Sequence, residues 1–302
     1  MVFLEYWLLF IKKDLKMGKN NTILLFLLIP ILFFSFGCKE RQLSPTKGSL
    51  KCYVDESLFK VVSAERDSFL VRYPQSKIEL VAVKAREGIA SILNGEAKLF
   101  VSSREMNDEE KAFLKKQKAN VRDYKFCYDA VVPIVREDNP KENILIDEIK
   151  KILNGEERSF RVFVPEINSG VYEYLKVKLL DKQELKNVSI VKSEEETIER
   201  VKATKNGFGF VGLNALADVK GVKILEVGSK VRSDGEALYY KPYVAYLVTR
   251  SYPLVRTTSV MINDYGAGLA AGFLTYLTSF EGQKIVSQNN LGPATVPVKM
   301  VN

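Results

Sequence analysis

Histidine is absent from this chain of 302 residues, cysteine occurs three times and tryptophan once. Without imidazole groups there can be no His-ligated metal site, Ser-His-Asp triad or Cys-His dyad. The carboxylates form no recognisable metal-binding or glycosidase pattern either. Because no nucleophile and base can be named, the sequence predicts a protein that is not an enzyme and that uses no metal or cofactor.

Acidic residues are fewer than basic ones, and the formal net charge is +8 at pH 7. The excess is spread along the chain, and its densest run, at 111–118, is expected to be a solvated helix face. No nucleic-acid motif and no alternation of aromatic with basic residues occurs, so we expect no nucleic-acid partner. A mild positive field would favour an anionic ligand instead.

A long apolar run occurs near the N-terminus. The stretch MGKNNTILLFLLIPILFFSFGCKER begins at Met17, is apolar at 23–34 and reaches a Gly just before Cys38. This order of charged, apolar and small residues is typical of a secretory signal. The Gly-Cys step resembles the lipobox of bacterial lipoproteins, in which the thiol is acylated. Ser35 and Phe36 depart from that pattern, which usually has Leu and a small residue there.

We therefore expect residues 1–37 to be a signal peptide, with the true start at Met17, and Cys38 to carry the lipid. Residues 38–49 are polar, contain Pro and Gly, and are expected to be a membrane tether. The alternative is an uncleaved anchor, although the apolar run is shorter than the roughly 20 residues that a spanning helix needs.

The two remaining cysteines, Cys52 and Cys127, lie in apolar runs that resemble strands. A pair in an exported protein could form a disulfide, but free cysteines that pack as small apolar groups are equally common. We favour buried thiols.

From Leu50 onward, segments typical of strands alternate with segments typical of helices. This order predicts an α/β fold with mixed, mainly parallel sheets flanked by helices. Strands are expected at 50–54, 77–83, 97–103, 160–164 and 188–191, a strand pair at 121–137, and a further strand at 240–250. Helices are expected at 58–73, 87–96, 107–118, 145–155, 171–180, 194–203 and 266–288.

Ligands of such folds gather where the carboxyl ends of strands meet the N-termini of helices. Four turns meet that description: Asp55–Ser57, Lys84–Gly88, Ser102–Glu105 and Asn168–Gly170. The last of them, Asn-Ser-Gly, is equally typical of an ordinary helix cap. From these residues alone, capping and anion binding both stay open.

Several segments together resemble the phosphate-binding protein of the high-affinity phosphate ABC transporter. They occur in family order and are KIELVAVKAREGIASILNGEAKLFVSSREMNDEE, DAVVPIVREDNP, INSGVYEYL, GFGFVGL and SFEGQKIVSQNNLGPATVPV. The resemblance covers Leu50 to Val298 and implies the type II periplasmic-binding-protein fold, in which two α/β lobes close on a ligand. Lobe 1 would comprise 50–130 and 245–302 and lobe 2 would comprise 131–244, with crossovers near 127–132 and 239–246.

Three of the four turns differ from the family's pattern, whereas the third keeps its Ser-Arg appearance at Ser103 and Arg104. The family usually has Gly-Ser-x-Thr at the first turn, where only the hydroxyl of Ser57 is retained, and Arg-x-x-x-Ser-Gly-Thr at the fourth, where Pro165 replaces Arg and Val171 replaces Thr. A carboxylate at Asp55 or Glu56 could accept the proton of monohydrogen phosphate, but two would repel an anion unless one points outward. We expect Ser57, Ser103, Asn168, Ser169 and Gly170 to bind the ligand at these turns. Lys84, Arg86 or Arg104 is expected to replace the charge of the missing arginine.

The function implied is that of an exported solute-binding lipoprotein that delivers phosphate or a similar oxyanion to ABC permease subunits. We expect a monomer in the cell envelope, anchored through its lipid on the periplasmic or extracytoplasmic face of a membrane. The alternative is a protein of the same fold that has lost phosphate binding and acts as a sensor or as a partner-binding lipoprotein.

Overall fold

The computed structural model describes residues 43–117, 120–231, 236–264 and 266–295. The predicted signal peptide and Cys38 lie outside these ranges. In the described part of the chain, no helix has both the length and the apolar character needed to cross a membrane. The first strand begins at Gly48, so the last two residues of the predicted tether belong to the sheet.

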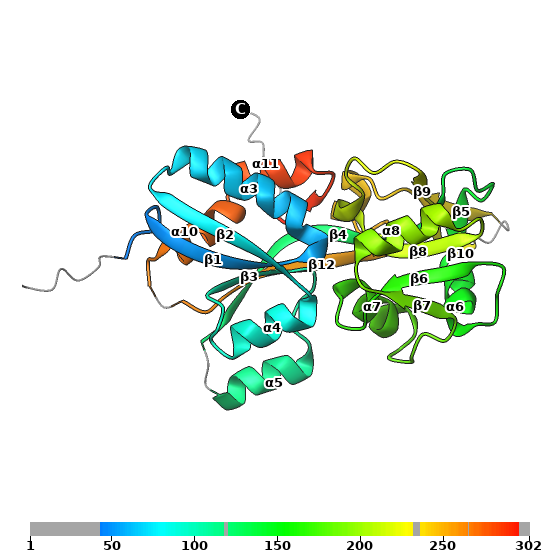
Figure 1. Cartoon of the computed structure of the whole chain (residues 1–302), viewed down its shortest axis with the longest axis horizontal. Coiled ribbons are helices and arrows are strands. Elements are labelled where there is room, and N and C mark those ends of the chain that lie inside the picture. Colours follow the sequence, from blue (N-terminus) through cyan, green and yellow to red (C-terminus); the bar gives the residue numbers. More distant parts are fainter. Residues whose placement is uncertain (1–42, 118–119, 232–235, 265, 296–302) are drawn as a thin grey trace, which may run out of the picture. The chain divides into compact units, whose positions relative to one another are not determined.

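One large sheet runs through the described chain (Figure 1). Its strands, in spatial order, are β2 (Ser76–Val83), β1 (Gly48–Asp55), β3 (Leu99–Ser102), β12 (Val255–Ile262), β4 (Arg122–Arg136), β8 (Gly207–Gly212), β6 (Arg161–Pro165) and β7 (Val188–Val191). The short strands β9 (Val222–Ile224) and β13 (Gly292–Pro293) pair with β4, and a separate small sheet contains β11 (Ala237–Tyr240), β10 (Glu226–Val231) and β5 (Asn143–Leu145). Parallel pairs form both ends of the large sheet, whereas β12 and β4 are antiparallel to their neighbours.

Helices cover both faces of the sheet, and the alternation of side chains along the strands explains why. Leu99 and Val101 of β3 point into a core cluster with residues of the helices α3 and α10. Phe100, between them, points to the other face and packs with Ile89 and Ile92 of α4. In Figure 1, α3 and α4 accordingly lie on opposite sides of β1.

The helices are α3 (Phe59–Arg72), α4 (Ala85–Leu93), α5 (Asp108–Gln117), α6 (Ile146–Asn154), α7 (Gly170–Tyr174), α8 (Glu194–Ala203), α9 (Val244–Val248), α10 (Leu269–Leu277) and α11 (Phe280–Gln288). Short helical turns occur at η1 (Glu56–Leu58), η2 (Leu175–Leu179) and η3 (Leu213–Leu216). The predicted α/β class, with a mainly parallel sheet flanked by helices, is confirmed.

The strands β4 and β12 run from the core cluster that contains Leu99 and Val101, called the first cluster here, to a second large core cluster. In β4, Phe126 packs in the first cluster and Ile134 in the second. In β12, Val260 packs in the first cluster and Val255 against the second. The second cluster also contains Leu247, Tyr252 and Leu254. The boundaries of the two lobes stay a prediction.

Three predicted elements are wrong. Residues 121–137 form the single strand β4 rather than a strand pair. Residues 240–250 form the end of β11 and the helix α9, because a short apolar run does not distinguish the two periodicities. The helix expected at 266–288 is two helices. Ser279 caps the second helix, and at Gly282 a Cβ atom would lie 2.3 Å from the carbonyl oxygen of Tyr276.

The thiols of Cys52 and Cys127 are both buried and free, as we favoured. Burial raises the pKa of each thiol well above its ordinary value. Cys127 also contacts the hydroxyl of Thr258 at 3.1 Å. Both side chains therefore act as small core residues.

Candidate functional site

The four turns predicted from the strand ends come together around the end of β1. The hydroxyl of Ser103 donates to Oδ2 of Asp55 at 2.8 Å, which joins the third turn to the first. The backbone N–H of Arg86 donates to the carbonyl oxygen of Asn168 at 3.3 Å, which joins the second to the fourth. A Cβ atom placed on Gly170 would lie 1.9 Å from Oγ of Ser103, so the third and fourth turns are in close contact.

A buried arginine, Arg256 of β12, lies at this junction. The residue is 4% exposed, and its Nε and Nη2 groups donate to Oδ2 of Asp129 at 2.9 and 2.6 Å. Asp129 lies directly opposite on the neighbouring strand β4. Among the described residues, Nη1 of Arg256 has no hydrogen-bond partner. Nη1 faces Gly170: a Cβ atom placed on that glycine would lie 3.3 Å from Nη1.

Arg256 is charged at any physiological pH. Burial works to lower its pKa, but the carboxylates of Asp129, Glu194 and Asp55 outweigh burial and raise the pKa above the usual value. The sequence analysis missed this residue. The only signal was a charged residue inside the run LVRTTSVMI, which is otherwise apolar or hydroxyl-bearing.

Three buried serines surround the arginine and make different hydrogen bonds. Ser57 donates to Oε1 of Glu194, and Ser103 donates to Asp55. Ser169 instead accepts the backbone N–H of Tyr172 at 3.1 Å and is the N-cap of α7. The fourth turn is therefore a helix cap in this structure, and it also lies against the buried guanidinium.

Glu194, the first residue of α8, is the second buried group that the sequence analysis missed. Glu194 is 3% exposed, and its Oε2 accepts the backbone N–H of Gly212 at 2.8 Å. Burial raises its pKa to about 7, and Glu56 and Asp55 act in the same direction, whereas Arg256 and Ser57 lower it. Nothing in the run of three glutamates at 194–196 distinguishes this one.

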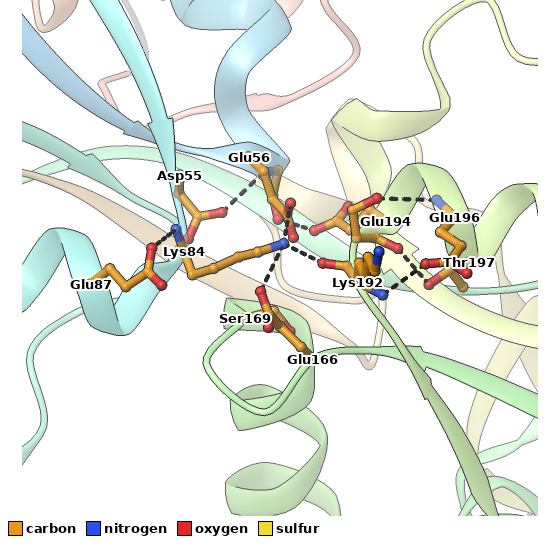
Figure 2. Close-up of polar contacts among 12 residues, drawn as sticks. Asp55, Glu56, Lys84, Glu87, Glu166, Ser169, Lys192, Glu194, Glu196 and Thr197 are labelled. Atoms are coloured by element: carbon orange, nitrogen blue, oxygen red, sulfur yellow. Dashed lines mark hydrogen bonds and ion pairs between the residues drawn. The ribbon is translucent and has the colours of Figure 1, made fainter.

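Lys84 lies at the edge of the cluster and is held by its own contacts (Figure 2). Its ammonium forms an ion pair with Glu56, donates to the carbonyl oxygen of Lys192 at 2.7 Å and lies 3.4 Å from Glu166. Burial raises the pKa of Glu56, although Lys84 opposes this. The Lys84 charge is therefore largely balanced within the protein.

The other two predicted cations have separate surroundings. Arg104 forms a two-point contact with Glu110, at 2.8 Å for both nitrogens, and its Nε lies 2.7 Å from Glu173. The side chain of Arg86 is exposed. The structure thus brings Ser57, Ser103, Ser169 and Gly170 around Arg256, with Lys84 and Asn168 at the edge, and pairs Arg104 elsewhere.

The chemistry available in this cluster is that of binding. In the described ranges, no group of three or more Cys, Asp or Glu side chains is placed to hold a metal ion. The buried part combines one guanidinium with hydroxyl donors and with carboxylate acceptors. Such a set suits a compact ligand that is an anion and also donates a hydrogen bond.

The chain is similar to curated phosphate-binding proteins. Among curated relatives, the phosphate-binding protein PstS of Borreliella burgdorferi is 27% identical over 252 residues, which cover 75% of this chain and 85% of that protein. The PstS protein of Staphylococcus haemolyticus is 23% identical over 245 residues, which cover 72% and 76%.

A solved structure has the same fold. It is a putative phosphate ABC transporter substrate-binding protein from Clostridium perfringens with bound phosphate, with a TM-score of 0.70 and 20% identity, covering 82% of this chain and 100% of that chain. The family model described as "PBP superfamily domain" matches residues 39–281. Because that match spans well over half of the chain, the protein belongs to the PBP superfamily and has the fold of its type II phosphate-binding members.

Proposed function

We propose that this protein is the solute-binding receptor of an ABC transporter and that it binds phosphate, or a closely related oxyanion, beside Arg256. The observation that carries the proposal is the Nη1 group of Arg256, which is buried and has no partner among the described residues. A buried donor without a partner costs about 1–3 kcal/mol. An oxyanion would satisfy it and would gain a charge-assisted hydrogen bond.

Arg256 offers a replacement for the family's arginine at the fourth turn. Pro165 occupies the place of that arginine and has no charge. Arg256 approaches the same turn from another strand, since its Nη1 lies against Gly170. We therefore assign the guanidinium of the site to β12 rather than to Lys84, Arg86 or Arg104.

The carboxylates favour phosphate over sulfate. Asp55 lies within the cluster and is buried, so it can accept a hydrogen bond from a P–OH group. Sulfate at neutral pH has no proton to donate, so the carboxylate of Asp55 would repel it. Chloride has neither the shape nor the donor. Ser57, Ser103, Ser169 and Gly170 complete the proposed contacts, with Lys84 and Asn168 at the edge of the site. Arg86, which is exposed, and Arg104, which pairs with Glu110 and Glu173, are left out of them.

The same proposal includes the cellular role. Similarity to the phosphate ABC transporter substrate-binding protein of Clostridium perfringens supports delivery of the ligand to ABC permease subunits rather than catalysis. Export by residues 1–37, lipid attachment at Cys38, an extracytoplasmic location on a membrane, ligand closure between two lobes and a monomeric state remain parts of the proposal. They rest on the sequence pattern and on the family.

A second candidate function is a protein of this fold that no longer binds phosphate and acts as a sensor or partner-binding lipoprotein. One specific observation favours it. The donors of Ser57 and Ser103 and the backbone N–H of Gly212 already have carboxylate partners within the protein. An incoming oxyanion would have to replace those bonds.

Thermal unfolding of the mature protein, stripped of phosphate, decides between the two. Phosphate, arsenate, sulfate and chloride would be added at fixed ionic strength. If the dissociation constant is micromolar, a thousandfold excess of phosphate stabilises the folded state by about 4 kcal/mol. For a chain of this size the melting temperature then rises on the order of 10 °C.

The variant Arg256→Lys keeps the charge but loses the planar donor fork, so it should weaken phosphate binding strongly. No rise in melting temperature with any oxyanion would contradict the receptor and favour the second candidate. An equal rise in the wild type and in Arg256→Lys would contradict the assignment of the guanidinium.

A further inference from the structure

The side chain of Glu194 occupies donors that an oxyanion would use. Oε1 accepts the hydroxyl of Ser57, and Oε2 accepts the backbone N–H of Gly212 at 2.8 Å. A Cβ atom on Gly212 would lie 2.7 Å from Nη2 of Arg256 and 3.2 Å from Oε2 of Glu194, so the guanidinium and the carboxylate lie around the same glycine. A hydroxyl, a backbone N–H and a nearby guanidinium are the surroundings that a bound anion requires.

Capping of α8 does not explain this arrangement. Ser193 caps the helix by accepting the backbone N–H of Glu196 at 3.2 Å, and the carboxylate of Glu196 accepts the backbone N–H of Lys192 at 3.0 Å. The N-cap of α8 is thus satisfied without Glu194, and Glu196 bonds to the residue before the cap, Lys192, which lies beside it in Figure 2. The carboxylate of Glu194 points away from its own helix and bonds to residues of η1 and β8.

The charged groups that face Glu194 come from several elements. Asp55 of β1 and Glu56 of η1 are negative, and Arg256 of β12 is positive. Asp129 of β4 binds the same guanidinium. Lys84 pairs with Glu56, so the four carboxylates still outnumber the two cations. A doubly charged ligand added to this set would face strong repulsion unless one carboxylate became neutral.

We propose that Glu194 is an internal anion that occupies the oxyanion site in the ligand-free protein, and that it takes up a proton when phosphate binds. The inference rests on the proposed function, because it concerns the same site. A proton from solvent would convert one oxygen of Glu194 into an O–H donor toward the ligand. The other oxygen would still accept the N–H of Gly212, and the hydroxyl of Ser57 would be released to donate to the ligand.

The ionisation of Glu194 supports this exchange. Burial, with help from Glu56 and Asp55, raises its pKa to about 7, so protonation near neutral pH requires little free energy. Above that pH, each further unit makes the required proton harder to take up. The affinity for phosphate should consequently decline as the pH rises through 7, in addition to any change caused by the ionisation of phosphate itself.

The test compares the wild type with Glu194→Gln and with Glu196→Gln. Glutamine keeps the volume of Glu194 and imitates its protonated form, with one acceptor oxygen and one N–H donor group, but it does not titrate. Glu196 is a matched carboxylate on the same helix that the site does not use. Calorimetric titration with inorganic phosphate from pH 6 to pH 8, in buffers of different ionisation heat, gives the dissociation constant and the number of protons taken up. The ionisation of phosphate contributes equally to the dissociation constants of the variant and the wild type, so its contribution cancels in their ratio.

We expect the ratio of the dissociation constants, wild type over Glu194→Gln, to increase about tenfold between pH 6 and pH 8. At pH 8 the wild type should take up about one more proton per phosphate than Glu194→Gln. Glu196→Gln should behave as the wild type does. If Glu194→Gln does not fold, Glu194→Ala gives the same readouts.

Three outcomes would overturn the inference. A ratio that does not change with pH, with equal proton uptake, would do so while leaving phosphate binding intact. Loss of binding in folded variants of Glu194 would show that the carboxylate holds the ligand instead of competing with it. Absence of binding in the wild type and in every variant at all pH values would reject this inference and the proposed function together.

Discussion

Two buried glutamates in this protein have similar burial and different surroundings. Glu65 of α3 is 0% exposed, and neither of its carboxyl oxygens has a hydrogen-bond partner within the described part of the chain. Glu194 is 3% exposed, but a hydroxyl, a backbone N–H and an arginine surround it. Burial raises the pKa of Glu65 to about 9, whereas that of Glu194 reaches about 7.

The difference shows how neighbours decide the use of a buried acid. Glu65 packs near Gly282 of α11, on which a Cβ atom would lie 2.9 Å from its Oε2, and it is neutral in the folded protein at pH 7. Glu194 ionises nearer to neutral pH because donors and a cation compensate its charge in part. One group is a core residue, and the other is placed to exchange a proton.

The largest effect is expected from removing the cation. Arg256→Met would leave Asp129 buried without its partner, which typically costs about 3–5 kcal/mol of stability. It should also raise the pKa of Glu194 further above 7, toward the behaviour of Glu65, because Arg256 lowers that pKa. Urea unfolding at pH 7 measures the stability.

The double variant Arg256→Met with Asp129→Asn is the control for this prediction. It removes the uncompensated charge and should recover part of the lost stability. A cost below about 1 kcal/mol in the single variant would show that Asp129 is not a buried charge that depends on Arg256.

The second prediction concerns Glu65. Its folded pKa is raised above the unfolded value, so its contribution to stability is complete below the unfolded pKa of about 4.3 and is lost as the pH rises toward 9. Between pH 5 and pH 7 the wild type should lose about 3 kcal/mol more unfolding free energy than Glu65→Gln. Urea unfolding at both pH values tests this.

Asp67→Asn, an exposed change on the same helix, should keep the pH dependence of the wild type. The same slope in Glu65→Gln as in the wild type would mean that Glu65 is ionised in the folded protein, and the contrast between the two glutamates would disappear.

A smaller effect is expected from Ser57→Ala, which removes the hydroxyl bound to Glu194. The loss of a hydrogen bond to a charged group costs about 1.5–3 kcal/mol. Since the hydroxyl lowers the pKa of Glu194, the cost should appear above pH 7 and diminish as the pH falls and Glu194 becomes neutral. Unfolding free energies at pH 6 and pH 8 would reveal it, and an equal cost at both would contradict the link to Glu194.

The smallest effect is expected from Ser169→Ala. This serine is as buried as Ser57, but its oxygen accepts a backbone N–H as the cap of α7. Loss of such a cap costs about 1 kcal/mol. The cost should not vary between pH 6 and pH 8, because the contact involves no ionisable group. A pH-dependent cost would show that Ser169 also contacts one of the buried carboxylates.

Local sequence signals were sufficient where an element depends on its own residues. The helix expected at 145–155 is α6, Ile146–Asn154, because Ile149, Ile152 and Leu153 form one buried face and Gly155 adopts a φ of 76° that ends it. The helix expected at 107–118 is α5, Asp108–Gln117, and the side chain of Asn107 just before it accepts the backbone N–H of Glu110 at 2.9 Å.

Elements whose pattern is ambiguous were missed or wrong. The strand β12 was not predicted, since its run mixes apolar, hydroxyl and basic residues. That strand is buried between β3 and β4, so both of its faces and both of its edges are satisfied by neighbours that a local pattern does not reveal. The helix α9 was predicted as a strand because aromatic and β-branched residues fill it.

The sequence by itself determined the α/β class, the order of the elements and the strand ends at which a ligand site would form, because these follow from periodicity and from the rule that ligands gather at the carboxyl ends of strands. Only the tertiary structure decided which charges meet there. Ser57 and Glu194 are 137 residues apart in the chain, and Asp129 and Arg256 are 127 apart. Contacts of that separation depend on strand order and register, which carry no local signature, and so the arginine and the glutamate of the site emerged only from the folded chain.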